Sequence, residues 1–459
     1  MKELCILSPT AILGYGFPEA SFIEGMKHKP DVIAVDAGST DPGPYYLGAG
    51  LSFTDHNAVM RDLSFMIPAA LEAKIPVIIG TAGGSGAKPH LDWQVDIIEE
   101  LAKTKNLSFK MAVISSDVSQ ETVLTKLKEG KILPLHPAPE LKEQDIIDSV
   151  QIVGQMGVEP IIYALEEGAD VIVAGRAYDP AVFAALAVKN GYDRGLSTHL
   201  GKILECAAIA ASPGSGSDCM IGWVGEDYFR VDTLSSARKC TVKSVAAHTL
   251  YEKTNPYILP GPGGVLNLTN TVFTQETDSA VKVTGSVFEP SNPNYVKLEG
   301  VKSAGFRTVS ICATADPVMM NQIDNIIAAV KDRVKSNFAG SIGDFKLDFK
   351  IYGRNGVMGI FEAGGFPQAN QDSKPHEFCF IIDAVAPTQE AANTICSFAR
   401  STLLHYGYEG RISTAGNLAF PFSPSDFKVG EVFEFSIYHL MEAPEPLEHF
   451  KVEIRRCGK

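Results

Sequence analysis

The first two hundred or so residues alternate between short, almost wholly apolar runs and longer stretches with apolar residues at helical spacing. The short runs are typical of β-strands buried on both faces, and the longer stretches are typical of amphipathic helices. The predicted strands cover residues 4–9, 31–38, 75–82, 110–117 and 169–177. The predicted helices cover residues 21–29, 56–74, 91–105, 120–130, 147–168 and 180–191. This order predicts an α/β fold with a doubly wound, mostly parallel sheet.

After a passage rich in Gly, Ser and Pro, the pattern changes to short β segments. These predicted segments cover residues 236–245, 263–273, 280–288 and 295–303. From about residue 303, strands are predicted at 307–317, 345–353, 356–364 and 376–387, and helices at 318–338 and 388–407. This succession predicts a smaller, ferredoxin-like α+β sandwich at the carboxyl end. We therefore expect a Rossmann-like domain at 1–230, a β-rich connecting segment at 231–300 and the α+β sandwich domain at 301–459.

Composition narrows the class of protein. The 459 residues are 45% hydrophobic and 20% charged, with a formal net charge of −14 and no run of Lys and Arg. Such a chain lacks the basic face that binds a phosphate backbone, so no nucleic acid partner is expected. Its amino terminus is typical of a first strand and not of a signal peptide, and no segment approaches the roughly 20 apolar residues of a membrane span. We expect a cytoplasmic protein without a membrane partner.

The eight cysteines are widely scattered, and several lie inside apolar strand or helix patterns. Most are expected to be reduced and packed as small hydrophobic side chains. The sequence contains neither a Cys-x-x-Cys pair nor a His-x-x-x-His pair, so no metal site is predicted. It indicates no particular cofactor.

Candidate chemistry gathers where the predicted strands end, because the carboxyl ends of parallel strands meet at one edge of a sheet. The turn at residues 80–86 holds four glycines but matches neither the Walker loop nor the dinucleotide fingerprint. Glycines let a backbone approach a ligand, and the first amides of the next helix favour an anion. The candidate substrate-binding residues are Ser39, Gly80, Thr81, Gly83, Gly84, Ser85 and Gly86. A tight turn without a ligand explains the same glycines, and both interpretations stay open.

Three ionisable residues lie at or just after the carboxyl ends of the second and fifth predicted strands, namely Asp36, Arg176 and Asp179. Arg176 has the geometry to clamp a substrate carboxylate, and either aspartate has the chemistry of a general base. In the alternative interpretation, Arg176 pairs with Asp179, which caps the helix that begins before Pro180. If Arg176 binds substrate, Arg176→Lys should lower activity more than tenfold and leave the melting temperature nearly unchanged.

Cysteine nucleophiles are a further possibility. Cys206 and Cys219 flank a Gly- and Ser-rich passage that is suited to a loop covering a substrate. A nucleophilic thiol needs a neighbouring base, which the sequence does not place. The buried, inert thiol is therefore the favoured interpretation for both residues.

Several stretches together resemble the acyclic terpene utilisation (AtuA-like) family. They are residues 171–183, 200–214, 239–273 and 280–288. The chain departs from the family pattern at Ala210–Pro213, where a pair of glycines is usual, and this indicates a divergent branch. The resemblance implies catabolism of branched or terpenoid acids. It also implies that the candidate catalytic residues include Glu205 and Cys206 beside Arg176 and Asp179, with Gly175 preceding them.

These observations favour a catabolic enzyme, a lyase or hydratase that acts on a small carboxylic acid or its acyl-thioester by acid/base chemistry. A hydrolase or amidase with a Cys or Ser nucleophile is the first alternative. A non-catalytic ligand-binding or assembly subunit is the second. A homo-oligomer is expected, since this is the usual state of such enzymes.

Overall fold

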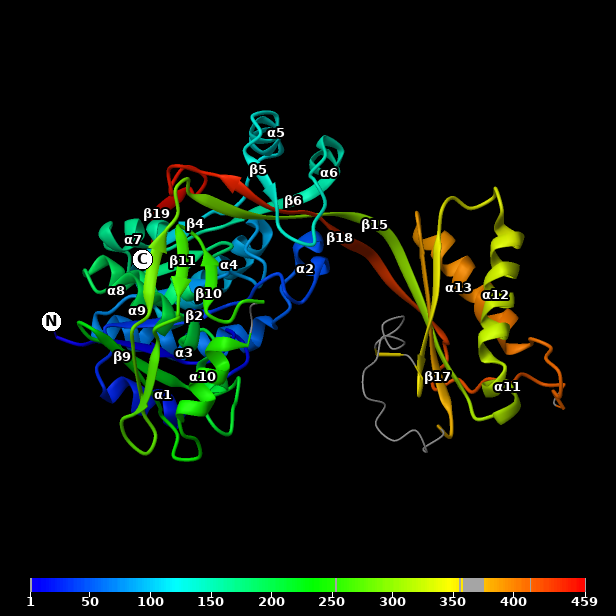
Figure 1. The fold of residues 1–459 in the computed structure, drawn as a ribbon, viewed down its shortest axis with the longest axis horizontal. Helices are drawn as coiled ribbons and strands as arrows, with labels where there is room; N and C mark the ends of the chain where they lie inside the picture. Colours follow the sequence, from blue (N-terminus) through cyan, green and yellow to red (C-terminus); the bar gives the residue numbers. More distant parts are fainter. Residues whose placement is uncertain (1, 252–253, 355, 358–374, 413, 459) are drawn as a thin grey trace. The chain divides into compact units, whose positions relative to one another are not determined.

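The computed structural model describes residues 2–251, 254–354, 356–357, 375–412 and 414–458 (Figure 1). The chain forms two compact units. The larger comprises residues 1–302 together with 435–459, and the smaller comprises residues 303–434.

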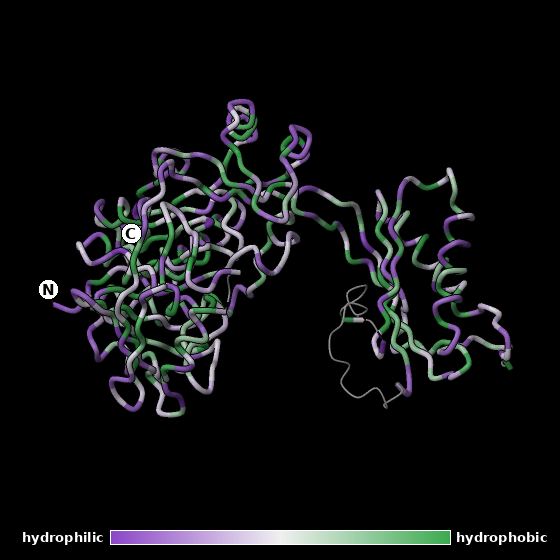
Figure 2. Tube along the Cα trace, in the orientation of Figure 1, coloured by the Kyte–Doolittle hydropathy of each residue, from purple (hydrophilic) through white to green (hydrophobic). Residues whose placement is uncertain are grey.

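The centre of the larger unit is a block of five parallel strands. In spatial order they are β1 (Leu4–Ser8), β2 (Val32–Asp36), β3 (Val77–Gly80), β7 (Val171–Ala174) and β4 (Phe109–Ile114). Every residue of β1, β2, β3 and β7 is buried, as their near-continuous apolar sequences predict. The tube in Figure 2 is accordingly hydrophobic along much of this interior. The α/β class and these five strands are confirmed.

Antiparallel strands extend the sheet at both edges. On the β1 side they are β8 (Met220–Val224), β9 (Tyr228–Thr233), β13 (Val281–Thr284) and β12 (Val272–Gln275), and on the β4 side β19 (Val452–Cys457). The ten described strands therefore form a mixed sheet, and the predicted mostly parallel arrangement holds only at its centre. The reason is local: β8 and β9, like β12 and β13, are joined by short turns, which permit only antiparallel pairing.

Helices pack on both faces of this sheet. One face carries α1 (Glu19–Lys27), α3 (His56–Ala73) and α4 (Lys88–Lys105). The other carries α5 (Gln120–Lys128), α7 (Glu159–Glu166), α8 (Asp179–Lys189) and α9 (Arg194–Leu204). Successive strand residues point to opposite faces, so Val32 and Ala34 pack into one core and Ile33 and Val35 into the other. Helix α3 begins where Asp55 accepts two amide hydrogen bonds, as an N-cap does.

Shorter elements surround these layers. They are α2 (Pro44–Ala49), β5 (Ile132–Pro134), α6 (Glu143–Ile147), β6 (Ser149–Gln155), η1 (Ala207–Ala210), α10 (Val242–Leu250), β10 (Ile258–Gly261), β11 (Gly264–Asn267) and β14 (Val287–Pro290). Two local predictions are wrong. The helix expected at 147–168 is strand β6 followed by α7, and the β segment expected at 236–245 gives way to α10 at Val242. Strand β6 is fixed by pairing with β15, a distant partner that no local pattern reveals.

The smaller unit is an α+β arrangement with the sheet order β16-β17-β15-β18. Its elements are β15 (Tyr295–Thr314), α11 (Pro317–Asn321), α12 (Ile323–Phe338), β16 (Lys346–Tyr352), β17 (Phe378–Ala386), α13 (Gln389–Leu404) and β18 (Asp426–Glu442). Its core joins Val330 of α12 and Ile395 of α13 to Phe380 and Ile382 of β17. The predicted strand at 356–364 lies largely within residues 358–374, outside the described residues. By their bounds, β15 and β18 each have residues in both units.

Candidate functional site

A group of acidic side chains lies at the carboxyl ends of the parallel strands. Asp36 ends β2, Asp179 begins α8 after β7, and Glu205 follows the last residue of α9. Asp36 is 6% exposed and Glu205 4%, whereas the side chain of Asp179 is 24% exposed. Their charges act on one another, because Asp179 and Glu205 both raise the pKa of Asp36. Three residues predicted from separate parts of the sequence are thus brought together.

Asp36 is the most perturbed member of this group. Burial raises its pKa well above the ordinary value, and the neighbouring charges of Asp179 and Glu205 raise it further. Two contacts oppose these effects: the Gly38 amide donates to Asp36 Oδ1 at 2.9 Å, and Arg176 supplies a positive charge. The net direction favours a neutral, protonated carboxyl group.

Arg176 lies against the acidic group but is fully engaged by the protein. Its Nε donates to Glu299 Oε2 at 2.6 Å, and its second amino group reaches Glu299 Oε1 at 3.5 Å. Nη1 donates to the Ala177 carbonyl at 2.7 Å, to Thr81 Oγ1 at 3.2 Å and to Asp179 Oδ1 at 3.3 Å. The side chain is only 3% exposed. The sequence suggested that the guanidinium of Arg176 binds a substrate carboxylate, and in the structure this group binds the carboxylate of Glu299.

Glu299, on β15, was not among the residues selected from the sequence. It is fully buried, and it also accepts from Lys297 Nζ at 2.6 Å and from Thr40 Oγ1 at 2.9 Å. Burial would raise the pKa of Glu299, but the charges of Arg176 and Lys297 outweigh it and hold the value at about 2. The available signal was a glutamate within a predicted strand, since a glutamate is rarely buried without a partner.

A second buried ion pair lies at the end of α9. Lys202 Nζ and Glu205 Oε1 are 2.5 Å apart, and both side chains are at most 5% exposed. Lys202 also was not selected from the sequence. Charged groups this deeply buried need partners, and Lys202 supplies one for the predicted site residue Glu205.

The glycine-rich turn after β3 is closely packed. Residues 80–87 are all buried. A Cβ on Gly86, whose φ is +74°, would lie 2.2 Å from the Arg176 amide nitrogen, and one on Gly83, at φ +59°, would lie 2.5 Å from the His90 carbonyl oxygen. These two positions therefore require glycine for packing alone, which supports the interpretation of a tight turn. The turn nevertheless brings Gly86 directly against the backbone of Arg176.

Several amides of this turn already have partners within the protein. Those of Gly84 and Gly86 donate to Thr81 and Ala82 carbonyls, and that of Lys88 donates to Asp117 Oδ1 at 3.1 Å. The anion-binding role of the turn stays a prediction.

The other predicted binding residues of this rim differ in their surroundings. Thr81 Oγ1 accepts from the Ala177 amide at 3.0 Å and so joins the turn to the Arg176 loop. Ser85 is 1% exposed, and its hydroxyl has no hydrogen-bond partner among the described residues. Ser39 is partly buried, and its hydroxyl accepts from the Asp41 amide at 3.2 Å.

The two candidate cysteine nucleophiles are held in unfavourable surroundings. Burial raises the pKa of both the Cys206 and the Cys219 thiols, and the adjacent carboxylates Glu205 and Asp218 raise them further. The thiolate is the nucleophilic form, so both residues are poorly suited to attack a substrate at neutral pH. Cys206 lies near Asp36 and Asp179, since their charges also raise its pKa.

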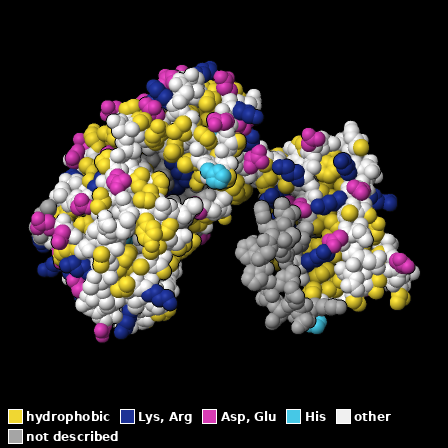
Figure 3. Space-filling model, viewed as in Figure 1, with side chains coloured by type: hydrophobic (Ala, Val, Ile, Leu, Met, Phe, Trp, Pro, Cys, Tyr) yellow, Lys and Arg dark blue, Asp and Glu magenta, His cyan; other side chains and the backbone are white. Residues whose placement is uncertain are grey.

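The described residues were also compared with the requirements of a metal site, a membrane span and a charged binding surface. No cluster of three or more His, Cys, Asp or Glu side chains in this part of the chain has an arrangement that could hold a metal ion. No described helix combines the length and apolar content needed to cross a bilayer. On the face shown in Figure 3, Lys and Arg side chains are interspersed with Asp and Glu.

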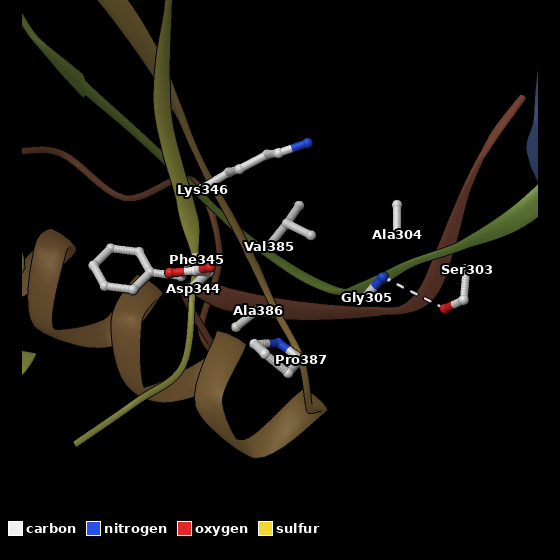
Figure 4. Close-up of a pocket in the computed structure, with 9 residues that line it drawn as sticks. All are labelled: Ser303, Ala304, Gly305, Asp344, Phe345, Lys346, Val385, Ala386 and Pro387. Atoms are coloured by element: carbon white, nitrogen blue, oxygen red, sulfur yellow. Dashed lines mark hydrogen bonds between the residues drawn. The ribbon is translucent and has the colours of Figure 1, made fainter. Parts of the chain in front are cut away.

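A hollow of about 640 Å³ lies in the smaller unit (Figure 4). It is lined by Ser303, Ala304, Gly305, Asp344, Phe345, Lys346, Val385, Ala386 and Pro387. None of the residues predicted as site residues lines it. Its lining also lacks a fully buried ionisable side chain, so proton-transfer chemistry is better supported at the acidic group of the larger unit.

The acidic group lies at the carboxyl ends of parallel strands, where open α/β sheets bind ligands. The chain belongs to the acyclic terpene utilisation family, described as "Acyclic terpene utilisation family protein AtuA", whose model matches residues 55–215 and 234–419. These ranges include Arg176, Asp179, Glu205 and Glu299, whereas Asp36 precedes them. Searches of curated proteins and of solved structures found no match. Membership confirms the family expected from the sequence and connects the chain with acyclic terpene catabolism.

Proposed function

We propose that this protein is a catabolic lyase or hydratase that moves a proton next to the carbonyl of a carboxylic acid or its acyl-thioester. The observation that carries the proposal is the buried carboxyl group of Asp36, which lies among other carboxylates at the end of β2. Acid/base catalysis needs a group that holds a proton near neutral pH and a second group that accepts one.

A balance of charges supports the assignment of Asp36 as the acid. The acidic group and its surroundings hold the carboxyl groups of Asp36, Asp179, Glu205 and Glu299 and the cations Arg176, Lys202 and Lys297. Each cation already contacts a carboxylate other than Asp36. Among the described residues, a negative charge on Asp36 would have no cation of its own in direct contact, and burying such a charge costs several kcal/mol. Protonation of Asp36 removes that cost.

Asp179 is suited to the opposite role. Its side chain is the most accessible of the three acidic residues and contacts Arg176 at 3.3 Å. A substrate that enters over Asp179 would meet this carboxyl group before the more deeply buried Asp36. The family supports a branched or terpenoid carbon chain on that substrate.

The alternatives receive less support. A hydrolase with a cysteine nucleophile would need a thiolate, and the raised pKa values of Cys206 and Cys219 oppose its formation. A non-catalytic binding subunit would not need a protonated carboxyl group of the kind that Asp36 favours.

The setting of this activity rests on the sequence. We expect a cytoplasmic homo-oligomer that acts on a small molecule, without a nucleic acid or membrane partner. We also expect the larger unit to be a doubly wound, Rossmann-like domain, because helices pack on both faces of its parallel centre. The succession β15, α12, β16, β17, α13, β18 supports a ferredoxin-like sandwich for the smaller unit.

Proton exchange tests the proposal without knowledge of the full reaction. Branched carboxylic acids and their coenzyme A thioesters are screened first by thermal shift, since a ligand at 100 times its dissociation constant stabilises by about 2.7 kcal/mol. Compounds that bind are then incubated with the protein in D2O, and hydrogen–deuterium exchange next to the carbonyl is followed by mass spectrometry. The wild-type protein should catalyse exchange in at least one of them.

The matched variants are Asp36→Asn and Asp41→Asn, because Asp41 is a nearby but exposed aspartate. Asp36→Asn should still bind the compound but lose exchange, whereas Asp41→Asn should keep both. Equal hydrogen–deuterium exchange by the wild-type protein and by Asp36→Asn would show that Asp36 takes no part in the proton transfer. Binding with no exchange in any compound would favour a non-catalytic subunit.

A further inference from the structure

The counter-ion of Arg176 comes from a remote part of the chain. Glu299 follows Arg176 by 123 residues and is fully buried. Its Oε2 accepts from Arg176 Nε at 2.6 Å, and its Oε1 accepts from Lys297 at 2.6 Å and from Thr40 at 2.9 Å. A carboxylate bound by three donors has its position fixed, as the supporting groups of a functional site do.

This contact decides where the other side of Arg176 points. With Nε held by Glu299, Nη1 is directed to the Ala177 carbonyl, Thr81 Oγ1 and Asp179 Oδ1. A buried guanidinium without its counter-ion would turn toward the nearest remaining carboxylates, since an unpaired buried charge is costly. Those carboxylates belong to the acidic group at the ends of β2 and β7.

We propose that Glu299 is a positioning residue of the acid/base site, which holds the guanidinium of Arg176 and cancels its charge beside Asp36, Asp179 and Glu205. The inference rests on the proposed function. It assigns to β15, a strand of a different sheet, a part in the chemistry at the ends of the parallel strands.

The expected consequence concerns the proton of Asp36. The charged groups that act on Asp36 are Asp179, Glu205 and Arg176; Glu205 is paired with Lys202, and the Cys206 thiol lies nearby. Replacing Glu299 by a neutral side chain removes the closer of the two carboxylates that Arg176 contacts and leaves its charge less fully compensated. A nearby positive charge favours the ionised form of a carboxyl group, so the pKa of Asp36 should fall.

The titration of Asp36 can be measured in the substrate-free protein. Aspartate labelled with ¹³C at the side-chain carboxyl is incorporated, the Asp36 resonance is assigned from its absence in Asp36→Asn, and its shift is followed against pH. Glu299→Gln should titrate at lower pH than wild type, and Glu299→Asp, which keeps the charge, should recover part of the difference. Thr40→Val, which removes one donor to Glu299, should shift the midpoint in the same direction by less.

The control is Glu3→Gln. Glu3 forms a similar two-contact pair with Arg230, at 3.1 and 3.0 Å, and is not among the charges that act on Asp36. It should leave the Asp36 titration unchanged. An Asp36 midpoint unchanged in both Glu299→Gln and Thr40→Val would overturn the role of Glu299. An Asp36 midpoint in the ordinary aspartate range already in the wild-type protein would instead overturn the proposed function.

Discussion

Arg176→Lys separates a structural role of this arginine from a substrate-binding role. If Arg176 held a substrate carboxylate, the substitution would lower affinity and leave the fold stable. The geometry leads to a different expectation, because all the contacts of the guanidinium described above are to the protein itself. A lysine keeps the charge but offers one nitrogen in place of the planar fork.

The magnitude follows from the contacts that a lysine cannot keep. One ammonium group can remain with Glu299, but then the donation to the Ala177 carbonyl and the contact with Asp179 are lost. Hydrogen bonds of a charged donor contribute about 1.5 to 3 kcal/mol each. Two lost contacts of this kind predict that Arg176→Lys lowers the free energy of unfolding by about 3 kcal/mol or more.

Tryptophan fluorescence in urea provides the assay, because both tryptophans, Trp93 and Trp223, belong to the larger unit. Arg194→Lys is the control. Arg194 pairs with Glu159 at 2.8 Å but is 30% exposed, and such pairs contribute at most about 1 kcal/mol. A loss of less than about 1 kcal/mol in the free energy of unfolding of Arg176→Lys would refute the structural role and favour binding of a substrate carboxylate by Arg176.

Three further predictions follow. His199 is fully buried between Ser286 and Thr249, and burial lowers its pKa to about 3. Between pH 6.5 and 3, only the unfolded chain then binds this proton. As the pH falls through this range, the wild-type protein should therefore lose about 1.4 kcal/mol of its free energy of unfolding per pH unit relative to His199→Gln. Parallel profiles of stability against pH for the two proteins would contradict this. Gly86→Ala should lower the free energy of unfolding in urea by about 2 to 5 kcal/mol, because of backbone strain and overlap with Arg176. Gly130→Ala, at φ +70° in open space, should lower it by only about 1 to 2 kcal/mol. Equal losses would show that the turn can shift to accept a Cβ at residue 86. Cys206 should resist alkylation by iodoacetamide at pH 7 until urea unfolds the chain, which mass spectrometry would show. Rapid labelling of the folded protein would instead support Cys206 as a nucleophile.

The parallel centre of the fold was predictable because its signal is local. A strand buried on both faces needs apolar residues at nearly every position, and residues 31–38 and 169–177 have them. The rule that parallel strands end at one edge then predicts that Asp36, Arg176 and Asp179 lie together. The structure places these residues within reach of one another.

The rest required tertiary information. Strand β6 has apolar residues that continue into α7 at helical spacing, and only its pairing with β15 decides its conformation. Glu299 is similar, since its partners Thr40 and Arg176 lie 259 and 123 positions away in the chain. The composition of a strand shows that an acid is present, but it does not show which cation that acid meets.

The same limit applies to Arg176, whose contacts with Glu299 the sequence did not reveal. A sequence search selects charged residues at strand ends as ligands for a substrate, although any buried charge must first satisfy the protein's own electrostatics. Arg176, Lys202 and Lys297 are each matched by a carboxylate within 3.3 Å. Among the residues that the structure describes, none of these ion pairs includes Asp36. Because the charges around Asp36 affect its pKa, we expect that removing the charge of Arg176 raises this pKa and that removing the charge of Glu299 lowers it.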